Sequence, residues 1–170
     1  MSEPPQSPDA EEPRFPAAST QEWKLWTSFF PMEGELWQWL SRRLRDDTDL
    51  SEADWQVLDA LGNTPGHLMR AFELAERTNS SKSRLHQHAA RMTKRGLLQQ
   101  HPATDDARGT VIGLTADGLA RFRTAQSHRA RHIREALIDA LSPEEVDLLI
   151  ELSTKIRRNL RDLSTPHRHA

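Results

Sequence analysis

The stretch that decides the fold is Arg70–Leu114, which reads RAFELAERTNSSKSRLHQHAARMTKRGLLQQHPATDDARGTVIGL. Its first eight residues are predicted to form a short helix, which the pair Thr78-Asn79 interrupts. A basic helix is predicted next, over residues 80–95, and Gly96 ends it because glycine commonly terminates helices. Two helices joined by so short a turn predict a helix-turn-helix motif.

Two short strands are predicted after these helices, over residues 97–101 and 110–114, with a charged tip over 104–109 between them. Gly109 permits a tight tip, and residues 67–69 are expected to add a one-bridge strand. A hairpin at this place is the wing of a winged helix-turn-helix, whose second helix enters the major groove of duplex DNA. The predicted fold class is mainly α with a small β-wing: a winged DNA-binding lobe plus N- and C-terminal dimerisation helices.

The basic helix has one apolar face and one polar face. At 100° per residue, Ala89 and Met92 lie beside Leu85, and this stripe is predicted to dock on the preceding helix. Asn79 or Ser80 is expected to cap the helix. Its polar face contains no Asp or Glu, and donors of this kind bind base edges and phosphates. The candidate DNA contacts are Ser80, Ser81, Ser83, Arg84, Gln87, His88, Arg91 and Lys94.

The wing tip contains Asp106 two residues before Arg108. A carboxylate at this distance can hold a guanidinium extended, and arginine favours the negative potential of a narrow minor groove. Both residues are therefore candidate DNA contacts. An ordinary charged hairpin loop is the alternative interpretation.

The chain resembles the multiple-antibiotic-resistance regulator (MarR) family of bacterial winged-helix repressors. The segments that carry the resemblance are Glu73–Ala75, Met92–Leu98, Asp105–Gly109 and Gly113–Gly118, within a similarity that covers roughly residues 23–163. It implies a homodimeric repressor that a small aromatic or lipophilic ligand releases from DNA. His86-Gln87 stands where the family often has a small hydroxylic residue followed by Arg, so the base preference is not implied.

The resemblance also implies an effector pocket between the dimerisation helices and the DNA-binding lobe. Trp37, Leu40 and Trp55 are expected at that junction. Tryptophans in such places more often belong to the hydrophobic core, which is the alternative interpretation.

Composition is consistent with a cytoplasmic DNA-binding protein. The 170 residues have a net charge of −2, but acidic residues crowd the first sixty positions while the segment predicted to face DNA is basic. Placement of charge, and not its sum, determines the electrostatic footprint. The chain has no cysteine and no apolar run that approaches a membrane span. No cofactor and no membrane partner are expected.

Five segments are predicted along the chain. They are a disordered acidic, Pro-rich arm (1–18), an N-terminal dimerisation helix (19–48), the winged lobe (49–114), C-terminal dimerisation helices (115–165) and a tail (166–170). Pro31 and Gly34 are expected to kink or split the N-terminal helix. Ser51 is followed three positions later by Asp54, a spacing that resembles a capping box at the start of the next helix.

The C-terminal third predicts a dimer. A helix of about 25 residues is expected to follow Thr115, and Ser142-Pro143 begins another. The last helix carries an apolar stripe at spacings of three and four, made of Val146, Leu149, Leu152, Ile156, Leu160 and Leu163. Such a stripe is longer than one small lobe can cover, so a second copy is expected to bind it. A two-fold dimer implies a palindromic operator. Packing within one chain is the alternative.

Two alternatives to a ligand-released DNA-binding regulator are a metal-responsive regulator and a protein-interaction module. His128 and His132 are four residues apart on a helix and could bind a metal in a metal-responsive regulator. Without a third ligand in nearby sequence, and with arginines beside them, no metal ligand is predicted. A winged-helix protein-interaction module without DNA contact is the second alternative. An enzyme is not predicted, because no phosphate loop, nucleophile motif or zinc-type His-Glu cluster is present.

Overall fold

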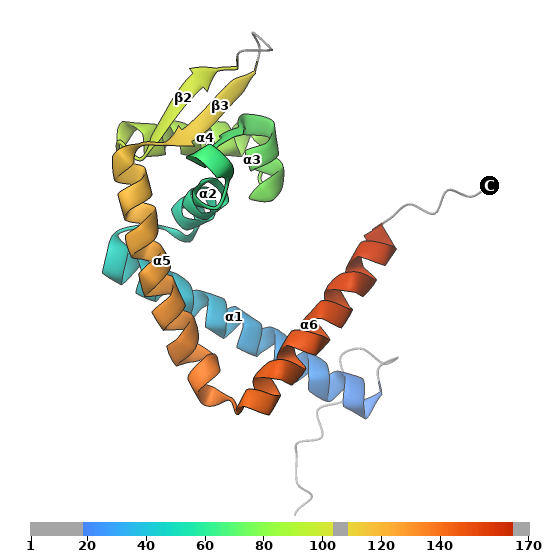
Figure 1. Cartoon of the computed structure of the whole chain (residues 1–170). Coiled ribbons are helices and arrows are strands. Elements are labelled where there is room, and N and C mark those ends of the chain that lie inside the picture. Colours follow the sequence, from blue (N-terminus) through green and yellow to red (C-terminus); the bar gives the residue numbers. More distant parts are fainter. Residues whose placement is uncertain (1–18, 104–108, 165–170) are drawn as a thin grey trace, which may run out of the picture. The chain divides into compact units, whose positions relative to one another are not determined.

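The computed structural model describes residues 19–103 and 109–164. The chain divides into two compact units, residues 1–39 and 40–170, and each is described by itself. Within the described ranges, six α-helices, two short 3₁₀ segments and three strands follow one another (Figure 1). The predicted fold class, mainly helical with a small β-wing, is confirmed.

The first unit consists of most of helix α1, Thr20–Thr48, whose last turns belong to the second unit. The helix continues through Pro31, so the split expected there is not observed. A proline removes only one hydrogen bond, which a helix of 29 residues tolerates. Trp26 and Phe30 meet edge to face, with ring centroids 5.6 Å apart, and both side chains are largely exposed.

Helix α2, Glu52–Gly62, is the first helix of the winged lobe in the second unit. The predicted capping box is confirmed: Ser51 Oγ accepts from the Asp54 amide (3.1 Å), and Asp54 Oδ2 accepts from the Ser51 amide (3.0 Å). A 3₁₀ turn at Pro65–His67 then leads into the sheet.

The helix-turn-helix consists of α3, Ala71–Arg77, and α4, Lys82–Lys94. Asn79 lies in the turn after α3 with a positive φ of 47°, a conformation that asparagine tolerates better than most residues. The prediction that Asn79 or Ser80 caps α4 was wrong. Both belong to the turn, and Ser81 has the extended backbone of a cap and accepts from the Arg84 amide (3.3 Å).

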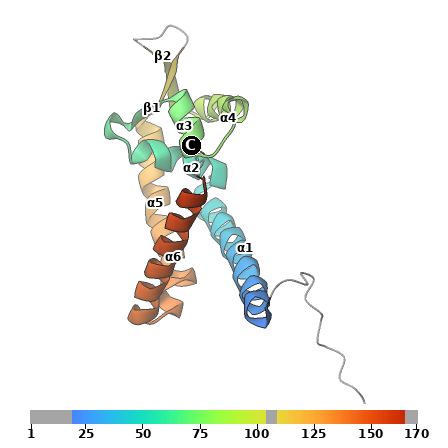
Figure 2. The ribbon, with the colours of Figure 1, turned by 90° about the vertical axis from the view of Figure 1, so that its right-hand side faces the viewer.

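Three antiparallel strands form the wing in the order β1–β3–β2. They are β1 (Leu68–Arg70), β2 (Leu98–Pro102) and β3 (Thr110–Leu114). The strand expected at residues 67–69 is shifted by one residue and pairs with β3 over three positions. Figures 1 and 2 show α3 and α4 packed beside each other, with the β2–β3 hairpin extending beyond them.

The predicted apolar stripe of α4 is confirmed, since Leu85, Ala89 and Met92 are all buried. They join one core with side chains of α2, α3, the wing and α5. Helix α5, Ala116–Ala136, packs against the wing at Gly118, where a Cβ atom would overlap the carbonyl oxygen of Leu97. This close approach requires glycine.

The C-terminal segment is a separate helix, α6, Pro143–Ser164, after a 3₁₀ turn at Ile138–Ala140. Because α5 ends at Ala136, before this turn, it is shorter than the 25 residues expected. No residue of α6 is buried, and Leu152, Ile156 and Leu160 are 45%, 53% and 55% exposed. Among the described helices, none is both long and apolar enough to cross a membrane.

Candidate nucleic-acid interface

The outward face of α4 lies opposite its buried stripe. Ser83, Gln87 and Lys94 point most directly away from Leu85 by helical position, and all three are exposed. Each of them can donate to base edges or phosphates. Ser81 caps the positive end of the helix, and the neighbouring Lys82 lines a groove together with Gly109 and Thr110.

One edge of this face lies against α2. Arg84 and Arg91 are exposed and, together with Gln56 of α2, line a cavity of about 140 Å³ between the two helices. The two arginines are therefore at the flank of α4 and not at its centre, about 100° to 120° from Leu85 by helical geometry.

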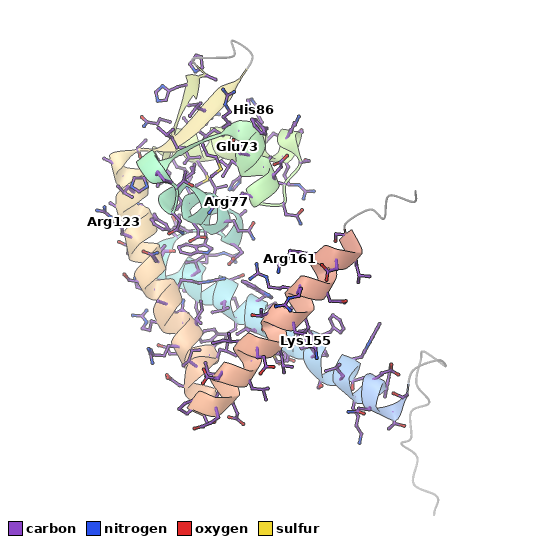
Figure 3. The ribbon with its side chains drawn as sticks, turned by 45° about the vertical axis from the view of Figure 1, so that its right-hand side comes forward. Glu73, Arg77, His86, Arg123, Lys155 and Arg161 are labelled. Atoms are coloured by element: carbon purple, nitrogen blue, oxygen red, sulfur yellow. The ribbon has the colours of Figure 1, made fainter. Side chains whose placement is uncertain are left out.

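The other edge lies against the wing. Arg70, Lys82 and His86 line a groove of about 310 Å³ that also includes Gly109 and Thr110 (His86 is labelled in Figure 3). Three side chains with donor groups around one groove can bind a phosphate. Arg70 and Lys82 were not among the predicted DNA contacts. Helical spacing could have found Lys82, because it lies one turn before His86 on the same flank.

Three of the expected contacts have partners within the protein. Ser80 is half-buried and its hydroxyl donates to the carbonyl of Thr78 (3.3 Å), while Ser81 is the cap of α4. His88 faces inward: its Nε2 lies 3.2 Å from Oδ1 of Asp54, and its side chain is only 14% exposed. This position favours a role for His88 in holding α4 over a direct contact with DNA.

Asp54 is the centre of a network under α4. Its side chain is 5% exposed, and Arg95 Nη1 donates to its Oδ2 (2.8 Å). Arg91 Nη2 donates to Nδ1 of His88 (3.1 Å), while Nε2 of the same ring faces Asp54. Arg95 Nη2 also donates to the carbonyl of Asp49 (3.1 Å). The network therefore ties α4 to α2 at two points and also orients Arg91.

Burial by itself would raise the pKa of the Asp54 carboxyl. The contacts from His88, Arg95 and Ser51 outweigh burial and hold this pKa well below its usual value of 3.8. Asp54 is thus ionised at neutral pH, and its charge is compensated by α4.

The wing-tip candidates Asp106 and Arg108 lie outside the described residues. The strands that lead to them, β2 and β3, are paired up to Pro102 and Thr110.

Comparison with known proteins agrees with this geometry. A family model described as "MarR family" matches residues 48–109. The chain is 30% identical over 108 residues to the transcriptional regulator HosA of Escherichia coli O157:H7, covering 64% of this chain and 78% of HosA. The chain belongs to the MarR family.

Two solved MarR-family structures from Streptomyces coelicolor have the same fold as this MarR-family protein. AbsC matches with a TM-score of 0.77 and 29% identity, covering 85% of this chain and 97% of AbsC. Sco3205, solved in complex with DNA, matches with a TM-score of 0.77 and 26% identity, covering 84% and 93%. The protein is accordingly a transcriptional regulator of the winged-helix type.

The residues expected around an effector pocket belong to both units of this MarR-family protein. Trp37, in the first unit, is 48% exposed. In the second unit Leu40 is buried, and Trp55 stacks on Phe122 with ring centroids 5.9 Å apart. The effector pocket stays a prediction.

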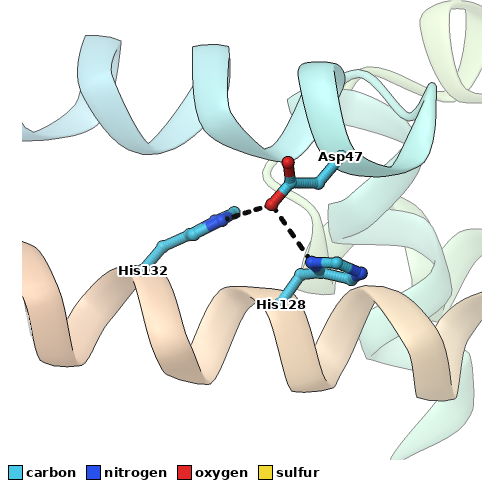
Figure 4. Close-up of side chains that lie close together, drawn as sticks. All are labelled: Asp47, His128 and His132. Carbon is cyan, nitrogen blue, oxygen red and sulfur yellow. Dashed lines mark hydrogen bonds and ion pairs between the residues drawn. The ribbon is translucent and has the colours of Figure 1, made fainter.

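A second polar cluster lies between the end of α1 and α5 (Figure 4). Asp47 Oδ2 is 2.8 Å from His132 Nε2 and 3.1 Å from His128 Nδ1. The hydrogen bond with His132 lowers the pKa of Asp47 most, burial opposes it, and the contact with His128 lowers it further. The two histidines were considered as metal ligands from their spacing, but Asp47, which is 81 residues before His128, was not predicted. No local spacing indicates such a pair.

Proposed function

We propose that this MarR-family protein is a homodimeric, sequence-specific repressor that binds a palindromic operator in the cytoplasm and that a small aromatic or lipophilic ligand releases. The observation that carries the proposal is the outward face of α4, where Ser83, Gln87 and Lys94 are exposed and no acidic side chain is present. Exposed donors on a helix that a wing accompanies fit the major groove. The solved complex of Sco3205 with DNA supports the same partner.

Both flanks of α4 add positive charge to this face. Arg91 lies on the α2 side, and Lys82 lies on the wing side. Cations on both sides of a central polar row suit the two phosphate backbones that border a major groove. A winged-helix protein-interaction module does not require this arrangement. We include Arg108 and Asp106 of the wing tip in the proposed interface, as the sequence predicts.

The homodimer is supported by the exposed apolar residues of α6. Six apolar side chains recur on one face of this helix, and none of them is buried in the single chain. Apolar surface of this length favours a partner that covers it, and two-fold symmetry presents two copies of α4 to DNA about one helical turn apart.

A selection of operator sequences from a random duplex pool tests this function. We expect the wild type to select an imperfect palindrome with half-sites roughly 10 bp apart. Gln87→Ala with Arg84→Ala should change the selected bases, because both side chains reach the groove side of α4. Lys94→Ala, near the helix end, should weaken binding to all sequences and reduce the slope of log affinity against log salt by about one unit.

Arg123→Ala is the matched control, since it removes one exposed arginine from α5 (Figure 3) and should leave the selected bases unchanged. Identical selected sequences for the wild type and the Arg84/Gln87 double variant would contradict base reading by α4. Failure of the wild type to enrich any sequence would favour the protein-interaction module.

The proposed release of the protein from DNA by a ligand can be tested separately. If an aromatic ligand binds near Trp37, Leu40 and Trp55, it should quench tryptophan fluorescence and lower operator affinity over the same concentration range. A coupling of about 1–3 kcal/mol is typical of such linkage. Trp55→Phe should reduce the quenching while leaving the operator affinity of the ligand-free protein unchanged. If such a ligand releases DNA without changing the tryptophan fluorescence, its binding site does not lie near these residues.

A further inference from the structure

The cluster of Asp47, His128 and His132 has the composition of a transition-metal site. Each residue offers one ligand atom, and these three atoms lie within 4.8 Å of one another. The two histidines are one turn apart on α5, so their rings project from the same face of the helix. Two imidazoles and one carboxylate form a common ligand set of zinc sites that keep a fourth position open.

The distances are close to those of a bound ion. In a tetrahedral site with bonds of about 2.1 Å, neighbouring ligand atoms are about 3.4 Å apart. Asp47 Oδ2 lies 2.8 Å from His132 Nε2 and 3.1 Å from His128 Nδ1. These two contacts would have to open by a few tenths of an ångström to admit an ion. The ligand nitrogens of His128 and His132, which lie within 4.8 Å of each other, would have to reach the same spacing by rotation of their side chains.

The three side chains of the cluster differ in how deeply they are buried. The His132 side chain is fully buried, whereas those of His128 and Asp47 are 27% and 22% exposed. An ion bound here would have one ligand anchored in the interior and a path to solvent on the other side. That open side leaves room for water as the fourth ligand.

The positive charge of Arg131 lies beside the cluster and would repel a metal ion. The contacts of its side chain show what it does there. Its Nη2 lies 2.7 Å from Asp47 Oδ2 and donates to Nδ1 of His128 (2.9 Å). Arginine can only donate, so His128 presents the lone pair of Nδ1 and Asp47 presents a carboxylate oxygen to the same positive group. The terminal nitrogen of Arg131 therefore lies where a metal ion would contact both ligand atoms, which are 3.1 Å apart.

Arg131 can also leave this position without losing its charge partner. Its side chain is 50% exposed, and its Nε already lies 3.7 Å from Oε1 of Glu135. The neighbouring Arg129 is engaged elsewhere, because both of its terminal nitrogens donate to the carboxylate of Glu52.

We propose that Asp47, His128 and His132 bind a divalent first-row transition metal ion, with zinc as the expected ion, and that Arg131 occupies the site when the ion is absent. On binding, the ion takes the place of Nη2 between Asp47 and His128, and Arg131 moves to Glu135. The ion joins the end of α1 to α5 within the second unit.

Metal titration of the full chain, after treatment with a chelator, tests the site. Zinc is titrated by calorimetry, and cobalt serves as a spectroscopic probe of tetrahedral N/O ligation. We expect one ion per chain. His128→Ala, His132→Ala and Asp47→Asn should each weaken binding by at least about tenfold, a loss that even outer-shell changes can reach. Arg131→Gln should bind more tightly than the wild type, because the competing cation is gone.

His101→Ala is the matched control, since this exposed histidine of β2 is far from the cluster in the fold and should not alter the titration. Zinc should raise the thermal midpoint of the wild type but not that of His128→Ala. The half-exposed His128 makes this variant informative even if His132→Ala fails to fold. Absence of a one-to-one complex, or equal binding by the wild type and His128→Ala, would overturn the proposal. Weaker binding by Arg131→Gln would overturn the assigned role of Arg131.

Discussion

Replacing Asp54 with alanine is expected to lower the free energy of unfolding by about 3 kcal/mol, because it breaks a buried ion-pair network. About 1 kcal/mol of this comes from the hydrogen bond of the capping box that the Asp54 carboxylate accepts from the Ser51 amide. The rest comes from Arg95 and His88, which lose the carboxylate that they share. Chemical denaturation at pH 7 measures the change, and operator affinity should also fall, since Arg91 is held through His88.

Asp59→Ala is the matched control for this substitution. Asp59 lies on the same helix, and its carboxylate accepts only an exposed hydrogen bond from Asn63 (2.8 Å) among the contacts described. We expect a loss of about 0.5 kcal/mol or less there, as for most surface changes. Equal losses for Asp54→Ala and Asp59→Ala would show that the network does not stabilise the lobe.

The stabilisation by Asp54 should also depend on pH in a defined direction. Its pKa is lower in the folded protein than its usual value of 3.8, so the unfolded chain takes up the proton first as the pH falls. The contribution is therefore complete above this value and is lost progressively below it. The difference in unfolding free energy between the wild type and Asp54→Asn should narrow as the pH falls below about 4.

Replacing Leu152 and Ile156 of α6 with aspartate is expected to abolish the homodimer. A dimer would bury four such side chains, and each contributes about 1.5 kcal/mol or more when covered, which gives about 6 kcal/mol in total. Charged groups in the same place add a desolvation penalty. Analytical ultracentrifugation should therefore report a monomer, and binding to a two-half-site operator should fall by at least two orders of magnitude.

Thr154→Asp is the control, because it places a negative charge on the opposite face of the same turn of α6. This variant should remain a dimer and bind DNA as the wild type does. Circular dichroism should report the same helix content for both variants. A double variant that still sediments as a dimer would contradict an interface on the apolar stripe of α6.

Local sequence pattern was sufficient for most of the secondary structure. The buried stripe at Leu85, Ala89 and Met92 followed from helical periodicity, and the capping box at Ser51 followed from residue order. Both depend on neighbours within about one turn of the chain, where backbone geometry leaves few alternatives. The cap of α4 was misassigned by one or two residues because Asn79, Ser80 and Ser81 can all cap a helix, and only the backbone conformation of the turn selects Ser81.

The assignment of charged side chains depended on the tertiary structure. The sequence by itself predicted the winged lobe, the polar face of α4 and the resemblance to the MarR family. It gave His88 and Arg91 the same role, whereas the fold turns His88 toward Asp54 and leaves Arg91 exposed. Arg95 is 41 residues from Asp54, and His132 is 85 residues from Asp47. Ion pairs at such separations form only where two helix faces meet, and the packing of the apolar core determines which faces do.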